Sequence, residues 1–204
     1  GKAGDGESAR RVWVTRSTDD GETFTPEVAA WSENTGACGC CGMTAAAAGD
    51  KTWVLYRSAT GGIHRDIHLL QSSGSESNFT GSRLDQWEIE SCPMSAMSLG
   101  ISGNTAAAAW EATGGEIAFS IIGTEIRGRV PQGSKGRKYP DLALTPDGHV
   151  LLTWINGAGW KKGGQLGWQL FNPAGKSIGL PSTGTATPIW TKPAAVFDGK
   201  SFLI

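Results

Sequence analysis

Three features are missing from this sequence, and each absence removes a class of protein. The 204 residues carry 18 basic and 19 acidic side chains, so a net charge of −1 gives no reason to expect a nucleic-acid partner. No apolar run reaches the length of a membrane-spanning helix, so we expect no insertion into a membrane. No long window has the apolar stripe of an amphipathic helix. A chain built from strands is the remaining expectation.

The ends of the chain also lack expected features. The first residues show no signal peptide, and both ends read as cut from a longer protein or trimmed by processing. The compartment must therefore be argued from the cysteines and from the fold.

Turn-forming residues and small residues are abundant instead. The 30 glycines, together with scattered tryptophans and β-branched residues, predict short strands joined by tight loops. Two alanine runs, 44–48 and 105–109, would favour helices by propensity alone. Because both adjoin glycine turns and aromatic strands, we interpret them as small residues in crowded inner strands.

One stretch of eight residues predicts a β-hairpin turn. Ser17 and Asp19 can hydrogen-bond the turn backbone, and Gly21 can adopt the positive φ of a tight turn. Thr23 and Phe24 then begin the return strand and are expected to pin the turn against the sheet. This stretch resembles the Asp-box, or BNR repeat, of sialidase-type β-propellers, where it is a structural element on the rim away from the active site.

A repeat of about fifty residues organises the rest of the chain. Four glycine-containing turns, each flanked by apolar strands, have their glycines at 49, 103, 148 and 199, at intervals of 54, 45 and 51 residues. This period matches a propeller blade of four short antiparallel strands. We therefore predict an all-β chain that forms one β-propeller domain or a fragment of one.

The predicted boundaries follow from this frame. Half a blade at 11–30 and half a blade at 192–204 flank three whole blades, at about 38–85, 92–130 and 139–182. Because the sialidase-type family usually has six blades, a fragment of a larger propeller is favoured. The alternatives are a four-bladed ring closed by its termini and completion by a second chain in a larger assembly.

All four cysteines fall on the predicted face opposite the Asp-box. Cys38, Cys40 and Cys41 lie in one loop, and Cys92 follows one blade later, where it is expected beside Cys41. The even count favours disulfides, with one bridge tying two blades. The alternative is a thiolate site for copper(I) or zinc, aided by neighbouring methionines and by His64 and His68.

A narrower resemblance involves the same loops. Ala37–Cys41, Tyr56-Arg57, Arg65-Asp66-Ile67 and Ser91-Cys92-Pro93 are similar, in order and spacing, to a bacterial branch of exported sialidase-like proteins. The resemblance covers about residues 12 to 120. It implies a periplasmic or extracellular location and, by fold alone, an exo-sialidase activity.

Sialidase chemistry needs arginines for a carboxylate, a tyrosine activated by a glutamate, and an acid. Arg57 and Arg65 are candidate arginines, Glu111 and Tyr139 the candidate pair, and Asp66 the candidate acid. The family's Arg-Ile-Pro segment is absent. An internal salt bridge between Arg65 and Asp66 is the structural alternative.

A binding role is the favoured prediction. Trp160 and Lys161, with His64, are candidate ligand-binding residues for a glycan or a partner protein on the same face. A basic segment of five residues precedes Tyr139 and is interpreted as a solvated loop; its members are Arg127, Arg129, Lys135, Arg137 and Lys138. The functions left open are a binding or scaffold propeller, a sialidase-type glycoside hydrolase, and a copper- or zinc-binding propeller.

Overall fold

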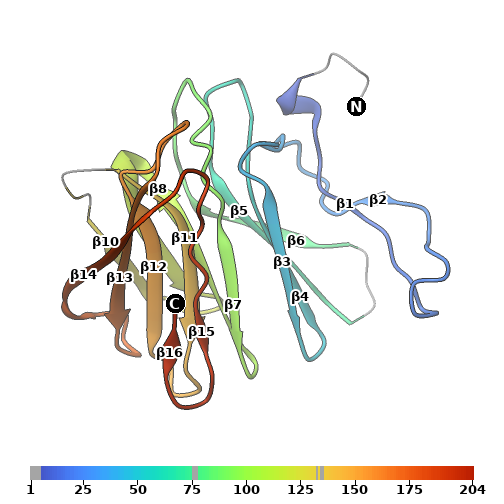
Figure 1. Cartoon of the computed structure of the whole chain (residues 1–204). Helices are drawn as coiled ribbons and strands as arrows, with labels where there is room; N and C mark the ends of the chain where they lie inside the picture. The colour runs from blue at the N-terminus through green and yellow to red at the C-terminus, as the bar shows by residue number, and fades with distance from the viewer. Residues whose placement is uncertain (1–5, 75–77, 132, 134–135) are drawn as a thin grey trace. The chain divides into compact units, whose positions relative to one another are not determined.

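A computed structural model of the chain describes residues 6–74, 78–131, 133 and 136–204. These residues form three antiparallel sheets of four strands and two short hairpins (Figure 1). The sheets run β3-β4-β5-β6, β7-β8-β9-β10 and β11-β12-β13-β14, so each strand pairs with the next one along the chain. The predicted all-β class with four-stranded antiparallel sheets is confirmed, whereas closure into a propeller stays a prediction.

The strands are short, as the density of turns predicts. Their bounds are Trp13–Val14 (β1), Val28–Ala29 (β2), Met43–Ala48 (β3), Lys51–Arg57 (β4), Ile67–Ser73 (β5), Thr80–Asp85 (β6), Ser98–Ser102 (β7), Thr105–Ala112 (β8), Glu116–Ile121 (β9), Arg127–Val130 (β10), Arg137–Leu144 (β11), Val150–Asn156 (β12), Gly164–Phe171 (β13), Ser177–Thr187 (β14), Val196–Phe197 (β15) and Phe202–Leu203 (β16). Two single-turn 3-10 helices, Glu7–Ala9 (η1) and Thr113–Gly115 (η2), complete the elements. Neither has the length to cross a membrane, and no other helix occurs in the described ranges.

The chain divides into two compact units, one that ends at Pro93 and one that begins at Met94, and each is described by itself. The first unit holds the β1–β2 hairpin and the β3–β6 sheet. Its core joins the two, because Val12 and Ala30 from the hairpin region pack with Val54, Tyr56 and Leu70 from the sheet. The cysteine loop lies directly before β3 in this unit.

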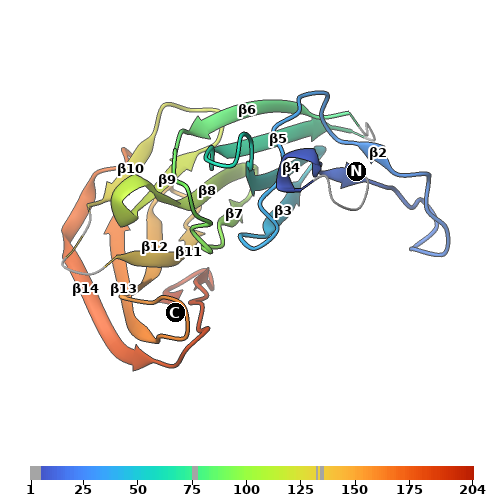
Figure 2. The same ribbon diagram turned by 90° about the horizontal axis from the view of Figure 1, so that it is seen from above.

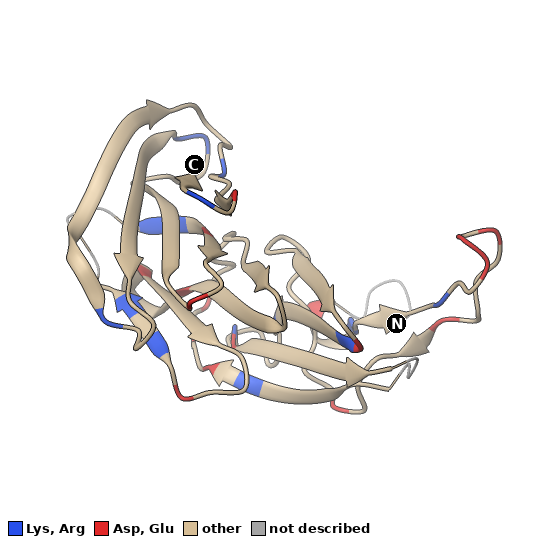
Figure 3. Cartoon of the chain, turned by 90° about the horizontal axis from the view of Figure 1, so that it is seen from below, with Lys and Arg blue, Asp and Glu red and all other residues tan. Residues whose placement is uncertain are grey.

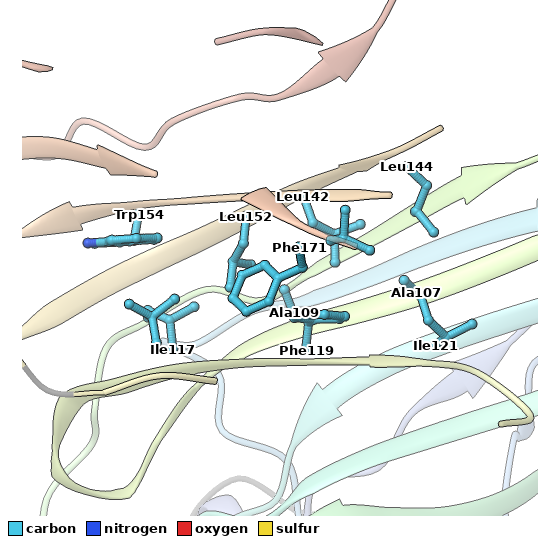
Figure 4. Packing of buried hydrophobic residues seen from close by; sticks show 12 residues of the cluster. Ala107, Ala109, Ile117, Phe119, Ile121, Leu142, Leu144, Leu152, Trp154 and Phe171 are labelled. Carbon is cyan, nitrogen blue, oxygen red and sulfur yellow. The ribbon is translucent and has the colours of Figure 1, made fainter. Parts of the chain in front are cut away.

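The second unit contains two complete sheets and the β15–β16 hairpin, and Figure 2 shows the successive pairing of β11 to β14. Aromatic and aliphatic side chains from both sheets meet in one core, drawn in Figure 4. Phe119 of β9 and Phe171 of β13 touch edge to face with ring centroids 4.8 Å apart. The same core includes residues of β8 and β11, the strands that carry Glu111 and Lys138.

The two alanine runs form strands, and only one of them is crowded. Ala107, Ala108 and Ala109 of β8 are fully buried, as expected for small residues beneath neighbouring side chains. The run in β3 is different, because Ala45 and Ala47 are exposed. The expectation of a crowded inner strand was therefore right for the second run and wrong for the first, whose sheet has β3 at its edge.

The turn between β1 and β2 has the hydrogen bonds that its sequence indicates. Ser17 Oγ accepts the Gly21 N–H at 2.8 Å, and Asp19 Oδ1 accepts the Thr23 N–H at 2.9 Å. Gly21 has a φ of 90°, in the region open to glycine. Phe24 was expected to pack on the sheet, but it is 61% exposed and lies before β2 begins. Hydrogen bonds, rather than packing of the Phe24 ring on the sheet, therefore hold this turn.

Candidate functional site

The cysteine loop is anchored by backbone hydrogen bonds before any side chain contributes. The Cys38 N–H donates to the Arg57 carbonyl at 2.9 Å, which ties the loop to the end of β4. The Ala37 N–H donates to the Glu7 carbonyl at 3.2 Å, which ties it to η1. Cys92 reaches the loop from the segment that follows β6. The start of that segment is held by a hydrogen bond from the Arg65 N–H to the Trp87 carbonyl, at 2.7 Å.

These anchors bring the four sulfur atoms together. Cys40 and Cys92 form a disulfide. Cys38 Sγ lies 3.2 Å from Cys41 Sγ, 3.2 Å from Cys92 Sγ and 3.6 Å from Cys40 Sγ. The Cys41 and Cys92 sulfurs are 3.7 Å apart, so the expectation that these two residues are neighbours is confirmed. Cys38 is the centre of the sulfur cluster, which we define as Cys38, Cys40, Cys41 and Cys92.

The sulfur cluster could hold a metal ion. Within the described part of the chain, the Sγ atoms of Cys38, Cys40 and Cys92 all lie within 4.8 Å of one another. Cys38 and Cys41 are each 3% exposed, whereas Cys40 lies at the surface, so the cluster is buried on one side and open on the other. The predicted disulfide is present for one pair only, because Cys38 and Cys41 lie outside it.

Charged groups surround the loop. The Glu7 carboxylate accepts the Gly39 N–H at 3.3 Å and pairs with Arg10 at 3.0 Å and with Arg65 at 3.2 Å. The neighbouring Cys41 lowers the pKa of Cys38 to about 6, assisted weakly by Arg65 and opposed by burial and by Glu7. Its lowered pKa gives Cys38 thiolate character near neutral pH.

The histidines expected beside the sulfurs have other contacts. His64 faces Glu88, with 3.5 Å between Nδ1 and Oε1. His68 stacks on Tyr56 with centroids 5.6 Å apart and touches Trp31, and burial lowers its pKa. Neither belongs to the metal-capable group identified in the described residues. The expectation that histidine nitrogens join the cysteine ligands is thus not supported, and the cluster offers sulfur alone.

The proposed sialidase residues of the first unit are built into its packing. Arg57 is 1% exposed, donates to the Arg65 carbonyl at 2.8 Å and lies over the Trp87 ring. Arg65 pairs with Glu7, and Asp66 pairs with Arg83 at 3.3 Å and accepts the Trp87 N–H at 3.0 Å. The Arg65–Asp66 salt bridge expected as the structural alternative is therefore wrong, because each residue has a different partner.

The candidate Glu and Tyr lie in the second unit. Both carboxylate oxygens of Glu111, on β8, accept hydrogen bonds from Lys138 Nζ of β11, at 3.2 and 3.3 Å. Tyr139 is buried with a φ of 56°, and its N–H donates to Ser95 Oγ at 3.0 Å. A register shift of β11 between Lys138 and Asp141 accompanies this unusual backbone. The catalytic roles of Glu111 and Tyr139 stay predictions.

The described members of the basic segment lie on strands rather than in a loop, and Figure 3 colours arginines and lysines blue. Arg129 of β10 pairs with Glu116 at 2.9 Å, and Arg137 of β11 lies 4.9 Å from the Trp154 ring centre. Lys135 lies outside the described residues. The interpretation as a loop was therefore wrong for the four described members, which lie on β10 and β11, although Arg127 and Arg129 are exposed to solvent.

An exposed tryptophan pair lies elsewhere in the second unit. Trp160 is 67% exposed and meets Trp190, itself 49% exposed, edge to face with centroids 5.1 Å apart. Lys161, next to Trp160, has a φ of 51° and is exposed. The sequence identified Trp160 and Lys161 but missed Trp190, since the two tryptophans are thirty positions apart and share no motif.

Glu7 was also missed, because an isolated glutamate near the start of a chain carries no motif. Its position beside Gly39 depends on η1 folding back onto the cysteine loop. Comparison with known proteins adds no further constraint: no protein-family model matches the chain, and no curated protein is significantly similar to it in sequence.

Proposed function

We propose that this chain is a β-sheet scaffold that binds one soft metal ion, copper(I) or zinc(II), through the sulfur cluster. The four sulfur separations of 3.2 to 3.7 Å carry the proposal. Thiolates at tetrahedral positions around one ion, each about 2.3 Å from it, lie about 3.8 Å from one another. An all-sulfur donor set favours copper(I) or zinc over harder ions such as Mg²⁺ or Ca²⁺.

Metal binding and the disulfide use the same atoms. The Cys40–Cys92 bond must accept two electrons and two protons, from a thiol or phosphine reductant, to give two thiols. Each thiol then loses its proton when it binds the ion. The oxidised chain is accordingly a stapled scaffold, and the reduced chain is the metal-binding form.

The test is a metal titration of the reduced full chain without oxygen. Cobalt(II), as a coloured substitute for zinc, is expected to give intense visible bands typical of tetrahedral thiolate coordination, with one ion per chain. Zinc is expected to displace it, and a copper(I) chelator competition measures the second metal. Cys38→Ser should abolish binding because Cys38 touches the other three sulfurs. Met43→Leu is the control and should bind normally.

Two results would contradict the proposal. One is a fully reduced chain, with four thiols by titration, that binds neither cobalt nor copper(I). The other is unchanged stoichiometry and colour in Cys38→Ser. The first result would leave the disulfide as the purpose of these cysteines, and the second would show that the metal is bound without Cys38.

The tryptophan pair supports a second candidate function, binding of an acidic glycan. Two exposed rings at right angles provide a stacking surface beside Lys161, Lys162 and Lys192, all of them exposed. The sequence from 148 to 197 contains no aspartate or glutamate, so the surroundings favour an anionic ligand. This deepens the binding role predicted from the sequence, with Trp190 added and His64 left out.

Calorimetry with a sulfated or uronic-acid oligosaccharide tests this candidate. Binding should weaken at least tenfold in Trp160→Ala, should fall with added salt, and should be absent for a neutral oligosaccharide of equal length. Trp13→Ala removes another exposed tryptophan, from the first unit, and should bind normally. Equal affinity for neutral and acidic sugars would argue against the charge-based recognition.

The sialidase activity, export and assembly into a larger propeller remain predictions. The disulfide is compatible with an exported protein. A sialidase would need Arg57 and Arg65 to meet a substrate carboxylate, and both side chains are buried among other contacts. Metal binding is therefore the better-supported proposal.

A further inference from the structure

The carboxylate of Glu7 connects Arg10 and Arg65 to the cysteine loop. One oxygen accepts the Gly39 N–H at 3.3 Å and lies 3.0 Å from Arg10 Nη1, while the other lies 3.2 Å from Arg65 Nη2. A methyl group placed on Gly39 would meet Arg10 Nη1 at 2.6 Å, so the Arg10 side chain covers the loop closely. A three-residue charged network therefore lies directly on the segment between Cys38 and Cys40.

Arg65 differs from Arg10 in its exposure and in its bonding. The Arg65 side chain is 7% exposed, whereas that of Arg10 is 52% exposed. The Nε and Nη1 atoms of Arg65 are buried and have no hydrogen-bond partner among the described residues. Buried guanidinium donors normally have acceptors, so this arginine retains donor capacity for an acceptor that the described protein atoms do not supply.

A metal thiolate centre has the charge that such an arginine matches. Four thiolates and one zinc ion sum to a charge of about −2, and copper(I) leaves one more negative charge. A partly buried centre of this charge needs compensating cations or donors nearby, and such groups tune metal affinity. Glu7 acts in the opposite direction, because its carboxylate adds negative charge at the same loop.

We infer that Arg65 is a positioning residue that stabilises the metal-bound sulfur cluster, and that the Glu7 carboxylate opposes it and thereby sets the affinity. This inference rests on the proposed metal function. It predicts that Arg65 and Glu7 change the metal affinity in opposite directions, although their side chains form an ion pair. A purely structural pair would give effects of the same sign, since losing either partner would loosen the loop.

The experiment measures zinc affinity of the reduced full chain by competition with a chromophoric chelator. Arg65→Gln is expected to weaken binding by about 10- to 100-fold, the usual range for outer-shell groups. Glu7→Gln is expected to tighten binding several-fold, because the amide keeps an acceptor for Gly39 and Arg10 but has no charge. Arg65→Lys, which keeps the charge without the planar fork, should fall between wild type and Arg65→Gln.

Arg83→Gln is the matched control, because it removes an arginine from another ion pair of the same unit and should leave zinc affinity unchanged. Circular dichroism and thermal unfolding of each variant establish folding, and Arg65→Met replaces Arg65→Gln if the latter unfolds. If wild type binds zinc but Glu7→Gln and Arg65→Gln both weaken the affinity, or both leave it unchanged, the inference is overturned and the proposed function stands. Failure of wild type to bind zinc or copper(I) overturns the proposed function, and the inference with it.

Discussion

At the scale of single residues, Asp19 shows how one carboxylate organises a turn. It accepts the Thr23 N–H at 2.9 Å, and both the Thr23 and Ser17 hydroxyls donate to it. These bonds to the charged form lower the pKa of Asp19 from 3.8 to about 2. The turn carries several acidic residues, visible as the red loop of the β1–β2 hairpin in Figure 3. The effect of the hydrogen bonds on the pKa of Asp19 exceeds the opposing effect of desolvation.

The lowered pKa predicts when this turn loosens. The contribution of Asp19 is fully present above pH 3.8 and is lost as the pH falls through about 2, because the folded form then takes up a proton. The Thr23 amide resonance, followed by NMR, should titrate with a midpoint near 2. Asp19→Asn should remove this titration and broaden the turn amides. A midpoint at 3.8 would show that the bonds do not form in solution.

Gly128 provides a packing prediction in the second unit. It pairs with Phe119 across β10 and β9, and a methyl group at Gly128 would lie 2.1 Å from the Phe119 ring. Because that ring packs against Phe171 in the core, Gly128→Ala should destabilise the fold by about 1–3 kcal/mol in urea unfolding. Gly136→Ala is the control, because no atom of the described residues lies within 4 Å of the added methyl. Equal stability of the two variants would argue against this ring position.

At the scale of elements, strands β8 and β11 are joined by a charged pair as well as by apolar packing. The Glu111 side chain is 6% exposed and that of Lys138 is 22% exposed, with 3.2 Å between the charged atoms. A buried carboxylate that loses its cation is costly, whereas the partly exposed lysine reduces that cost. The Glu111–Lys138 pair therefore helps to join the two sheets, whatever further role Glu111 has.

Lys138→Met should destabilise the chain by about 2–3 kcal/mol, because Glu111 is left buried without this cation. Glu111→Gln combined with Lys138→Met should recover part of the loss, since the amide has no charge to leave uncompensated. Urea unfolding of the two single variants and the double variant measures the coupling. A loss below about 0.5 kcal/mol, the size of a surface ion pair, would contradict the prediction.

At the scale of the whole molecule, the sulfur cluster belongs entirely to the first of the two units. A ligand that binds only the native state, at a hundred times its dissociation constant, stabilises that state by about 2.7 kcal/mol. If metal binds at the cluster, this stabilisation should be confined to the elements that carry it. The second unit therefore serves as an internal reference.

Hydrogen exchange of the reduced full chain, with and without zinc, tests this locality. Amides of β4 and β5 should exchange up to about a hundredfold more slowly with zinc, where exchange requires opening of that unit. Amides of β12 and β13 should keep their rates. Uniform protection of both units would show that the cluster is not thermodynamically local, and protection of neither would argue against specific binding.

Much of the architecture was predictable because local rules determine it. Four of the glycine turns recur at a near-constant period, and the predicted segments 38–85, 92–130 and 139–182 contain nearly all of the strands of the three sheets. The burial of Phe24 and of the alanine run in β3 was overestimated, because burial there depends on partners that are distant in the sequence.

The candidate site was only half predictable. The sequence by itself determined the turns, the four-stranded antiparallel units and the grouping of Cys38, Cys40 and Cys41 beside Cys92, because hydrogen-bonding patterns and chain spacing act locally. Only the tertiary structure decided the partners: Glu7 for Arg65, Arg83 for Asp66, and Trp190 for Trp160. Side chains far apart in the sequence meet through the packing of whole strands and loops, and no local pattern encodes that contact.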